Sequence, residues 1–313
     1  MFNDIESKNP FFSSDYFKSY APINILRSWR RARLYEGGKA ADLDWLLWIV
    51  LGFSLQKVAF NRKKIFKLPK SLTNLTKIWQ WHCSEQVPLQ YLIGICPWRD
   101  LYLTVDSGVL IPRQETELLV NFALQCLAMC KNGNLHNSNL HRWADLGTGS
   151  GAIAVTLAKA LPTWLGHAID CSYEALTQTQ NNLNQLVKNT NVIVSHGYWC
   201  EPLISLSGQI DLIVANPPYI PSELIKTLEG NIINHEPLLA LDGGSDGLSA
   251  IRIIVHLASE ILTPGGWILI EHHYDQSVDV IKLMKAADLI HICRASDIEG
   301  NQRFAIARKS FFK

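Results

Sequence analysis

Residues 144–154 read ADLGTGSGAIA: a short apolar segment, a turn with three glycines, and the start of a helical pattern. Glycine lets the backbone turn tightly and approach a ligand closely, and a helix that begins near Gly151 offers free N–H groups there. Such a turn serves a nicotinamide dinucleotide, a nucleoside, or only the packing of helix on strand. The segment therefore predicts a strand, a turn and a helix, and leaves the ligand open.

From about residue 140 onward, short β-rich runs alternate with helical ones. We expect strands at 143–146, 164–169, 191–195, 211–215, 267–272, 291–296 and 304–309, and helices at 151–161, 173–186, 248–262 and 278–287. This alternation indicates a mostly parallel sheet with helices on both faces. Ligands of such sheets bind beyond the carboxyl ends of the strands, so we expect the functional residues there.

The next expected strand ends in a carboxylate, Asp170, which follows Gly147 by 23 residues. A carboxylate in this place accepts hydrogen bonds from both hydroxyl groups of a ribose, which favours an adenosine-type ligand. Gly147, Gly149 and Gly151 are spaced as GxGxG and not as GxGxxG. The spacing favours S-adenosyl-L-methionine over a dinucleotide as the cofactor.

The fourth expected strand ends in NPPY, residues 216–219. Pro217 and Pro218 have fixed φ angles and no N–H, so they hold this segment stiffly. The side-chain oxygen of Asn216 and the carbonyl of Pro217 can accept the two hydrogens of a planar NH₂ group, while Tyr219 packs against it. We expect Asn216, Pro217 and Tyr219 to be catalytic by positioning a methyl acceptor, which all four residues bind. The alternative is a plain Asn-Pro turn.

The chain has 313 residues, 48% of them hydrophobic and 18% charged, which suits one large domain and a smaller one. Its longest apolar run, 45–53, is shorter than the roughly 20 residues of a membrane span, and no secretory signal is visible. We expect a cytoplasmic protein without membrane contact. Cysteine and histidine spacings predict no metal site.

Residues 1–105 contain 15 Lys and Arg against 8 Asp and Glu, a net charge of +7, whereas the remainder carries −6. The basic segments 27–33 and 61–70 fit contact with nucleic acid or with an acidic protein, and fit a solvated helix face equally well. Between about residues 20 and 92 the apolar period is helical. A small helical bundle is therefore expected in front of the sheet.

Two sequence features of this expected helical bundle can be compared with a structure. Ser71 is a candidate N-cap for the helical pattern that follows it. Trp79 and Trp81 resemble an aromatic platform for bases, but at helical spacing we expect one core residue and one that is partly exposed.

Several motifs occur together in this chain: VLIPRQETE (109–117), DLGTGSGAIA (145–154), NPPYI (216–220), NHEPLLALDGGSDGL (234–248), ILIEHH (268–273) and a helical front ending in VPLQYLIG (87–94). In this combination the chain resembles the glutamine-N5 methyltransferases of peptide-chain release factors, the HemK/PrmC family. The resemblance covers nearly the whole chain beyond about residue 20. It implies methyl transfer from S-adenosyl-L-methionine to the glutamine N5 of the Gly-Gly-Gln motif in class-1 release factors.

The resemblance also implies an architecture. A Rossmann-like seven-stranded methyltransferase domain, 109–313, would follow a linker at 96–108. A helical substrate-recognition domain would occupy 1–95, with about 1–20 as a poorly defined extension.

Residue roles follow from the same resemblance. The turn Gly147–Gly151, with Thr148 and Ser150, would surround the methionine part of the cofactor, and Asn216 would also face it. Asp170 would bind the ribose, and Trp199 would lie by the adenine. The NPPY segment would hold the glutamine side chain.

Three positions depart from the usual family pattern. Tyr198 stands where an acidic residue is usual, Gln114 where proline is frequent, and His273 where glycine is frequent. The first puts contacts with the edge of the adenine in doubt, and none of the three changes the NPPY segment.

Charged residues in the other motifs have more than one interpretation. Arg113 and Glu117 would orient the cofactor, clamp a loop, or form an ion pair between the domains. Glu236 and Asp246 flank a glycine-rich loop and would either close over the substrate or cap local structure.

Two rival functions remain at this point. One is an enzyme that methylates an exocyclic amino group of a base in RNA or DNA, which also uses NPPY; the sequence has no known nucleic-acid-binding signature. The other is a non-catalytic adaptor that retains the fold. The intact Asn216, Pro217 and Tyr219 disfavour the adaptor.

Overall fold

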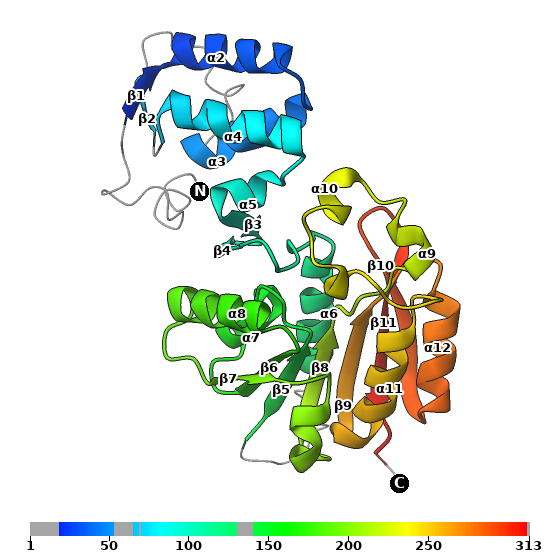
Figure 1. Cartoon of the computed structure of the whole chain (residues 1–313). Helices are drawn as coiled ribbons and strands as arrows, with labels where there is room; N and C mark the ends of the chain where they lie inside the picture. The colour runs from blue at the N-terminus through cyan, green and yellow to red at the C-terminus, as the bar shows by residue number, and fades with distance from the viewer. Residues whose placement is uncertain (1–18, 53–64, 69, 130–139, 312–313) are drawn as a thin grey trace. The chain divides into compact units, whose positions relative to one another are not determined.

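The computed structural model describes residues 19–52, 65–68, 70–129 and 140–311 (Figure 1). Nearly all of the expected extension at 1–20 and half of the basic segment 61–70 lie outside these ranges. The chain divides into two compact units. The first comprises Met1–Tyr102 with Gly230–His235, and the second comprises Leu103–Glu229 with Glu236–Lys313.

The first unit is built mainly from helices, as expected from the period of its apolar residues. Their bounds are α2 Ile23–Tyr35, α3 Ala40–Leu51, α4 Leu72–Glu85, α5 Leu89–Ile93 and α10 Gly230–Ile233. The apolar residues of α3 and α4 enter one core with Leu26 and with Trp79, which is fully buried. Ser71 caps α4, because its hydroxyl accepts a hydrogen bond from the Asn74 N–H at 3.2 Å. Trp81 is 63% exposed, so the interpretation of the tryptophan pair is confirmed.

Two short strand pairs in the front part of the chain were not expected. β1 (Ser19–Pro22) pairs antiparallel with β2 (Ile65–Leu68), and β3 (Ile95–Trp98) forms a two-stranded sheet with β4 (Leu101–Thr104). Strands of four residues are too short for a clear alternation of apolar and polar positions. The partner of β1 is also more than 40 residues away, so local pattern does not reveal it.

The second unit contains the expected sheet of seven strands, in the order β10-β11-β9-β8-β5-β6-β7. The strands are β5 Arg142–Leu146, β6 Leu165–Asp170, β7 Val192–His196, β8 Ile210–Ala215, β9 Leu262–Glu271, β10 Leu289–Ser296 and β11 Gln302–Lys309. The strands from β5 to β9 are parallel, whereas β11 runs antiparallel to both β9 and β10. Every residue of β8 is buried, as a central strand covered on both faces requires.

Helices cover this sheet in two layers (Figure 1). α6 contacts α7, which contacts α8, while α11 contacts both α12 and the 3₁₀ helix η5. Their bounds are α6 Thr116–Met129, α7 Ala152–Ala160, α8 Tyr173–Leu186, η5 Glu201–Leu206, α11 Ser249–Ile261 and α12 Ser277–Ala286, with the short α9 Ser222–Ile225 and η6 Leu238–Ala240 after β8. The Rossmann-like fold class is thereby confirmed. Within the described ranges, every helix falls short of the length and apolarity that a bilayer crossing requires.

Candidate active site at the carboxyl ends of the strands

The pairing of the parallel strands sets four residues in one row. Ile169, Leu146, Ala215 and Ile270 are register partners across β6, β5, β8 and β9. The residue after each of them therefore stands at the same level of the sheet. These next residues are Asp170, Gly147, Asn216 and Glu271. Because strand order reverses at β5, the row lies where open α/β sheets bind ligands.

The glycine turn after β5 has the backbone form that its sequence requires. Gly147, Gly149 and Gly151 have φ angles of +74°, +56° and +80°. A Cβ on Gly147 would lie 3.2 Å from Cζ3 of Trp199, so glycine here lets that indole ring pack on the turn. Trp199 and the glycine turn are therefore brought together.

A buried carboxylate, Asp145, secures the same turn. Its Oδ2 accepts hydrogen bonds from Thr148 Oγ1 at 2.8 Å and from the Ala154 N–H at 3.1 Å. Burial raises its pKa to about 7, against the opposing effect of these two donors. Sequence reasoning missed this residue, although it precedes the glycine turn in the DLGTGSG motif.

Asp170 is held by the backbone on both of its oxygens. Oδ2 accepts from the Gly149 N–H at 2.9 Å and Oδ1 from the Ser172 N–H at 3.0 Å. Burial raises the pKa of the carboxyl group, and the N–H donors oppose that rise. The Asp170 carboxylate is thus oriented beside the glycine turn.

A cavity of about 330 Å³ joins these elements. Its lining includes these predicted site residues: Arg113, Gly147, Thr148, Gly149, Ser150, Asp170, Trp199, Asn216 and Pro218. Gly151, Pro217, Tyr219, Glu117 and Glu236, all within the described ranges, stand outside the lining. The volume lies in the range of small-molecule sites. A glycine turn, a carboxylate at the next strand end and an indole ring in one cavity fit an adenosine-type cofactor.

The NPPY segment begins at the floor of this cavity. Asn216 Nδ2 donates to Thr116 Oγ1 at 3.0 Å, and no donor among the described residues reaches Asn216 Oδ1. Pro217 is buried, and the Tyr219 hydroxyl donates to Glu271 Oε1 at 3.4 Å. Burial raises the pKa of Tyr219, so its hydroxyl keeps its proton. The side-chain oxygen of Asn216 is therefore available as an acceptor.

Glu271 lies behind this segment and is only 1% exposed. Burial raises its pKa to about 7, while the hydroxyl of Thr116, the positive charge of Arg303 and the hydroxyl of Tyr219 oppose the rise. Neither Thr116 nor Glu271 was assigned a role from sequence. Both lie in motifs that carry the family resemblance, IPRQETE and ILIEHH, and that was the only signal.

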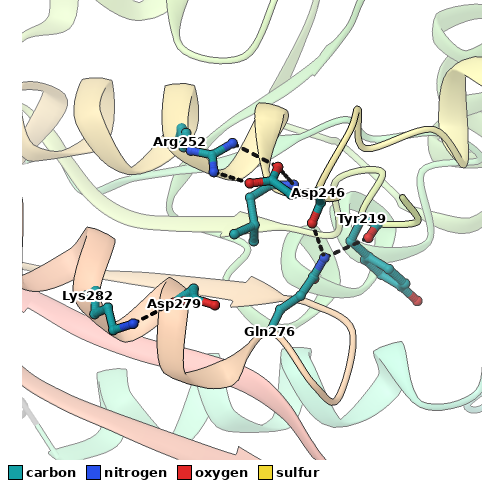
Figure 2. A network of polar contacts seen from close by, with 7 residues as sticks. Tyr219, Asp246, Arg252, Gln276, Asp279 and Lys282 are labelled. Atoms are coloured by element: carbon teal, nitrogen blue, oxygen red, sulfur yellow. Dashed lines mark hydrogen bonds and ion pairs between the residues drawn. The ribbon is translucent and has the colours of Figure 1, made fainter. Parts of the chain in front are cut away.

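The other end of the segment is held from the start of α12. Gln276 Nε2 donates to the Tyr219 carbonyl at 2.8 Å and to the Asp246 carbonyl at 3.4 Å (Figure 2). The Asp246 carboxylate pairs with Arg252 and accepts from the Leu248 N–H, which lowers its pKa to about 2. The NPPY segment is thus tied to the glycine-rich loop before α11.

Two of the remaining predicted residues, Arg113 and Glu236, are paired with each other within the second unit. Arg113 Nη2 donates to Glu236 Oε1 at 2.7 Å, and Glu236 Oε2 accepts from the Ile111 N–H at 3.3 Å. Glu117 lies in the first turn of α6. Arg113 and Glu236 therefore brace the cavity wall together.

The three departures from the family pattern fall in different surroundings. Tyr198 lines the cavity and is 57% exposed, while Gln114 is exposed. His273 Nδ1 lies 2.6 Å from Asp275 Oδ1, outside the cavity lining. Of these three residues, Tyr198 is the one that lines the cavity.

Comparisons with known proteins agree with this geometry. A family model described as the methyltransferase small domain matches residues 132–235. A protein of Prochlorococcus marinus named release factor glutamine methyltransferase is 47% identical over 296 residues, which cover 93% of this chain and 98% of the relative. Relatives of the same name from Thermosynechococcus vestitus and Synechocystis are 46% and 39% identical, covering 77% and 89% of this chain and 80% and 93% of their own.

Among solved structures, the catalytic domain of hMettl16, crystallised with hairpin 6 of the MAT2A 3'UTR, has a TM-score of 0.51. It is 17% identical and covers 67% of this chain and 76% of that domain. At this identity the likeness shows a shared fold alone. The relatives at 39–47% identity, which match over most of both chains, show to which family this chain belongs. This chain belongs to the family of release factor glutamine methyltransferases.

Proposed function

We propose that this protein transfers a methyl group from S-adenosyl-L-methionine to the side-chain N5 of the glutamine in the Gly-Gly-Gln motif of class-1 release factors, in the cytoplasm. The observation that carries the proposal is the row of strand ends. It sets the Asn216 carboxamide beside the glycine turn and Asp170, and all three line one cavity. A methyl donor and an amide acceptor would then have neighbouring sites.

The cofactor supplies an activated methyl group on a sulfonium centre, so the protein's task is chiefly to position the acceptor. Asn216 Oδ1 and the Pro217 carbonyl would accept the two N–H hydrogens of the glutamine amide, and Tyr219 would support its flat face. Holding two reactants in the productive geometry contributes about 7–11 kcal/mol in favourable cases. The amide becomes more acidic as it is methylated, so no residue needs to act as a strong base beforehand.

The cofactor contacts are proposed on the same basis. The turn from Gly147 to Gly151 would surround the methionine part, Asp170 would accept from the ribose hydroxyls, and Trp199 would lie by the adenine. The indole ring packed on the turn and the carboxylate oriented by two N–H groups support these roles.

The direct test is a transfer assay with labelled cofactor and three acceptors: a purified class-1 release factor, total RNA and total DNA. We expect label in the release factor, and none in a variant of it whose Gly-Gly-Gln glutamine is replaced by alanine. Label in nucleic acid alone would favour the base-methylating alternative. A protein that binds cofactor but labels no acceptor would favour the adaptor.

Two substitutions separate the acceptor role from the cofactor role. Asn216→Ala removes an acceptor for the amide and is expected to lower turnover by about 100-fold or more with little change in cofactor affinity. Asp170→Ala is expected to weaken cofactor binding about tenfold or more, because it removes a charged hydrogen-bond acceptor. Calorimetry beside the transfer assay measures both quantities. Equal losses of turnover and affinity in Asn216→Ala would contradict the role given to that residue.

A further inference from the structure

Two buried groups lie beside Asn216, and the proposed reaction leaves them without a role; one of them, Thr116, also lines the cavity. Thr116 begins α6 and is 4% exposed, and Glu271 ends β9 and is 1% exposed. The Thr116 hydroxyl accepts from Asn216 Nδ2 at 3.0 Å and interacts with the Glu271 carboxylate. Oε2 of that carboxylate has no partner at normal hydrogen-bond geometry among the described residues. A threonine hydroxyl thus stands between a buried carboxylate and the Asn216 amide.

A hydroxyl group has one hydrogen, and beside a buried carboxyl group it turns that hydrogen toward a carboxyl oxygen, which accepts in the charged and in the neutral form. The Thr116 oxygen then presents only lone pairs to Asn216. An oxygen with lone pairs attracts the NH₂ end of a carboxamide and repels its carbonyl end. Asn216 must therefore turn Nδ2 toward Thr116, which leaves Oδ1 for the cavity.

We propose that Thr116 and Glu271 are positioning residues that set the Asn216 carboxamide with its oxygen available to the methyl-accepting NH₂ group. The inference rests on the proposed function, since it assumes that Asn216 receives an amino group. A reversed Asn216 amide would meet the acceptor NH₂ with its own NH₂. Neither group would then find a hydrogen-bond acceptor in the other, and the nitrogen to be methylated would lose its orientation.

The charges around Glu271 are compatible with this role. Tyr219 donates to Oε1 at 3.4 Å, so the same carboxylate also holds the aromatic residue of the NPPY segment. Arg303 on β11 and Glu115 are the charged groups that act on it. Arg303 is itself paired with Asp297 at 2.8 Å. Whether charged or neutral, the Glu271 carboxyl group keeps an oxygen that can accept from the Thr116 hydroxyl.

The test compares three threonine variants by turnover, cofactor affinity and unfolding. Thr116→Val keeps the shape and removes the hydroxyl, and it is expected to lower kcat by about tenfold or more while cofactor Kd stays within about twofold. Thr116→Ser restores the hydroxyl and should restore turnover. The matched control is Thr156→Val in α7, an 8% exposed threonine outside the cavity whose hydroxyl donates to the Ala152 carbonyl of its own helix.

A double mutant decides whether Thr116 acts through Asn216. In an Asn216→Ala background there is no amide left to orient, so adding Thr116→Val should cause no further loss of turnover. A structural role for Thr116 predicts the opposite, a similar loss in both backgrounds. The inference is overturned if the loss persists in the double mutant, or if Thr116→Val and Thr156→Val behave alike.

The glutamate is tested by Glu271→Gln. Its NH₂ group would donate to Thr116, which frees the hydroxyl hydrogen for Asn216 Oδ1, so turnover should fall with cofactor affinity retained. Unchanged turnover would remove Glu271 from the proposal. If the wild type labelled only RNA or DNA, the proposed function would fail. The same variants could then be compared with the nucleic acid as the acceptor. The inference would still be testable, because an exocyclic amino group needs the same Asn216 oxygen.

Discussion

The burial of Glu271, which we propose positions Asn216, lowers the stability of the folded protein at neutral and alkaline pH. Its carboxyl group is buried, and its pKa rises from an ordinary value of 4.5 to about 7. Burial disfavours the charged form, so the folded protein is most stable while Glu271 is neutral. Stability is therefore lost as the pH rises from about 4.5 to about 7, the interval between the unfolded and folded pKa values.

Glu271→Gln should be stabilising at alkaline pH, although we expect it to lower turnover. The glutamine stays neutral, so the free energy of unfolding of the variant relative to the wild type should increase by up to about 3 kcal/mol between pH 4 and pH 8. Denaturant unfolding at the two pH values measures this. Glu260→Gln, at an exposed glutamate of α11, is the control and should show no such increase. A difference that does not vary with pH would count against a neutral, buried Glu271.

At the scale of elements, the strands supply the row of residues to which we assign the proposed function, and the loops hold the NPPY segment in shape. After β8 the chain is bridged to the loop before α11, since the Ile220 carbonyl accepts from the Gly243 N–H at 2.8 Å. Gly247 in that loop has a φ of +74°, and a Cβ there would collide with the Tyr219 carbonyl and with Gln276 Nε2. This close approach requires glycine.

Gly247→Ala is therefore expected to displace the Tyr219 carbonyl and to lower turnover by about tenfold or more. Gly300→Ala in the β10–β11 turn is a matched control, because Gly300 has a φ of +90° with open space around its Cβ position. Both substitutions cost backbone strain, so both should lower the unfolding midpoint, but only the first should impair transfer at a temperature where both variants are folded. Equal activity of the two variants would argue against the clamp on Tyr219.

At the scale of the whole molecule, charge separates along the chain: residues 1–105 carry +7 and the remainder −6. Arg30 and Arg33 of α2 are paired with Asp44 and Glu36, whereas Arg27 and Arg31 are exposed on the same helix. We propose that the first unit recognises the release factor, and that this basic helix contributes electrostatic attraction.

Replacing Arg27 and Arg31 by glutamate should then lower kcat/KM for the release factor about tenfold at low salt, with kcat and cofactor Kd nearly unchanged. The effect should shrink as salt is added, because salt screens exposed charges. Lys159→Glu with Lys188→Glu, at exposed positions of the second unit, changes the net charge equally and should have little effect. Equal losses in both double variants would point to net charge instead of a docking surface.

Much of the second unit could be predicted from local pattern. Alternating β-rich and helical runs located its strands to within five residues at each end. The signal is clearest for the central strand β8, which is buried on both faces and is therefore a nearly continuous apolar segment. Local pattern did not predict which strands pair: β10 pairs antiparallel with β11, and β1 pairs with β2. Strand partners are set by contacts between segments that are distant in sequence, and a four-residue strand carries too little pattern of its own.

The sequence by itself determined the glycine turn, the carboxylate at Asp170 and the stiff NPPY segment, because each depends on residues that are adjacent along the chain. Only the tertiary structure decided which groups stand behind Asn216. Thr116, Asn216 and Glu271 come from α6, the end of β8 and the end of β9, and their hydrogen bonds and pKa values exist only once the sheet register and the packing of α6 bring them together in a buried place.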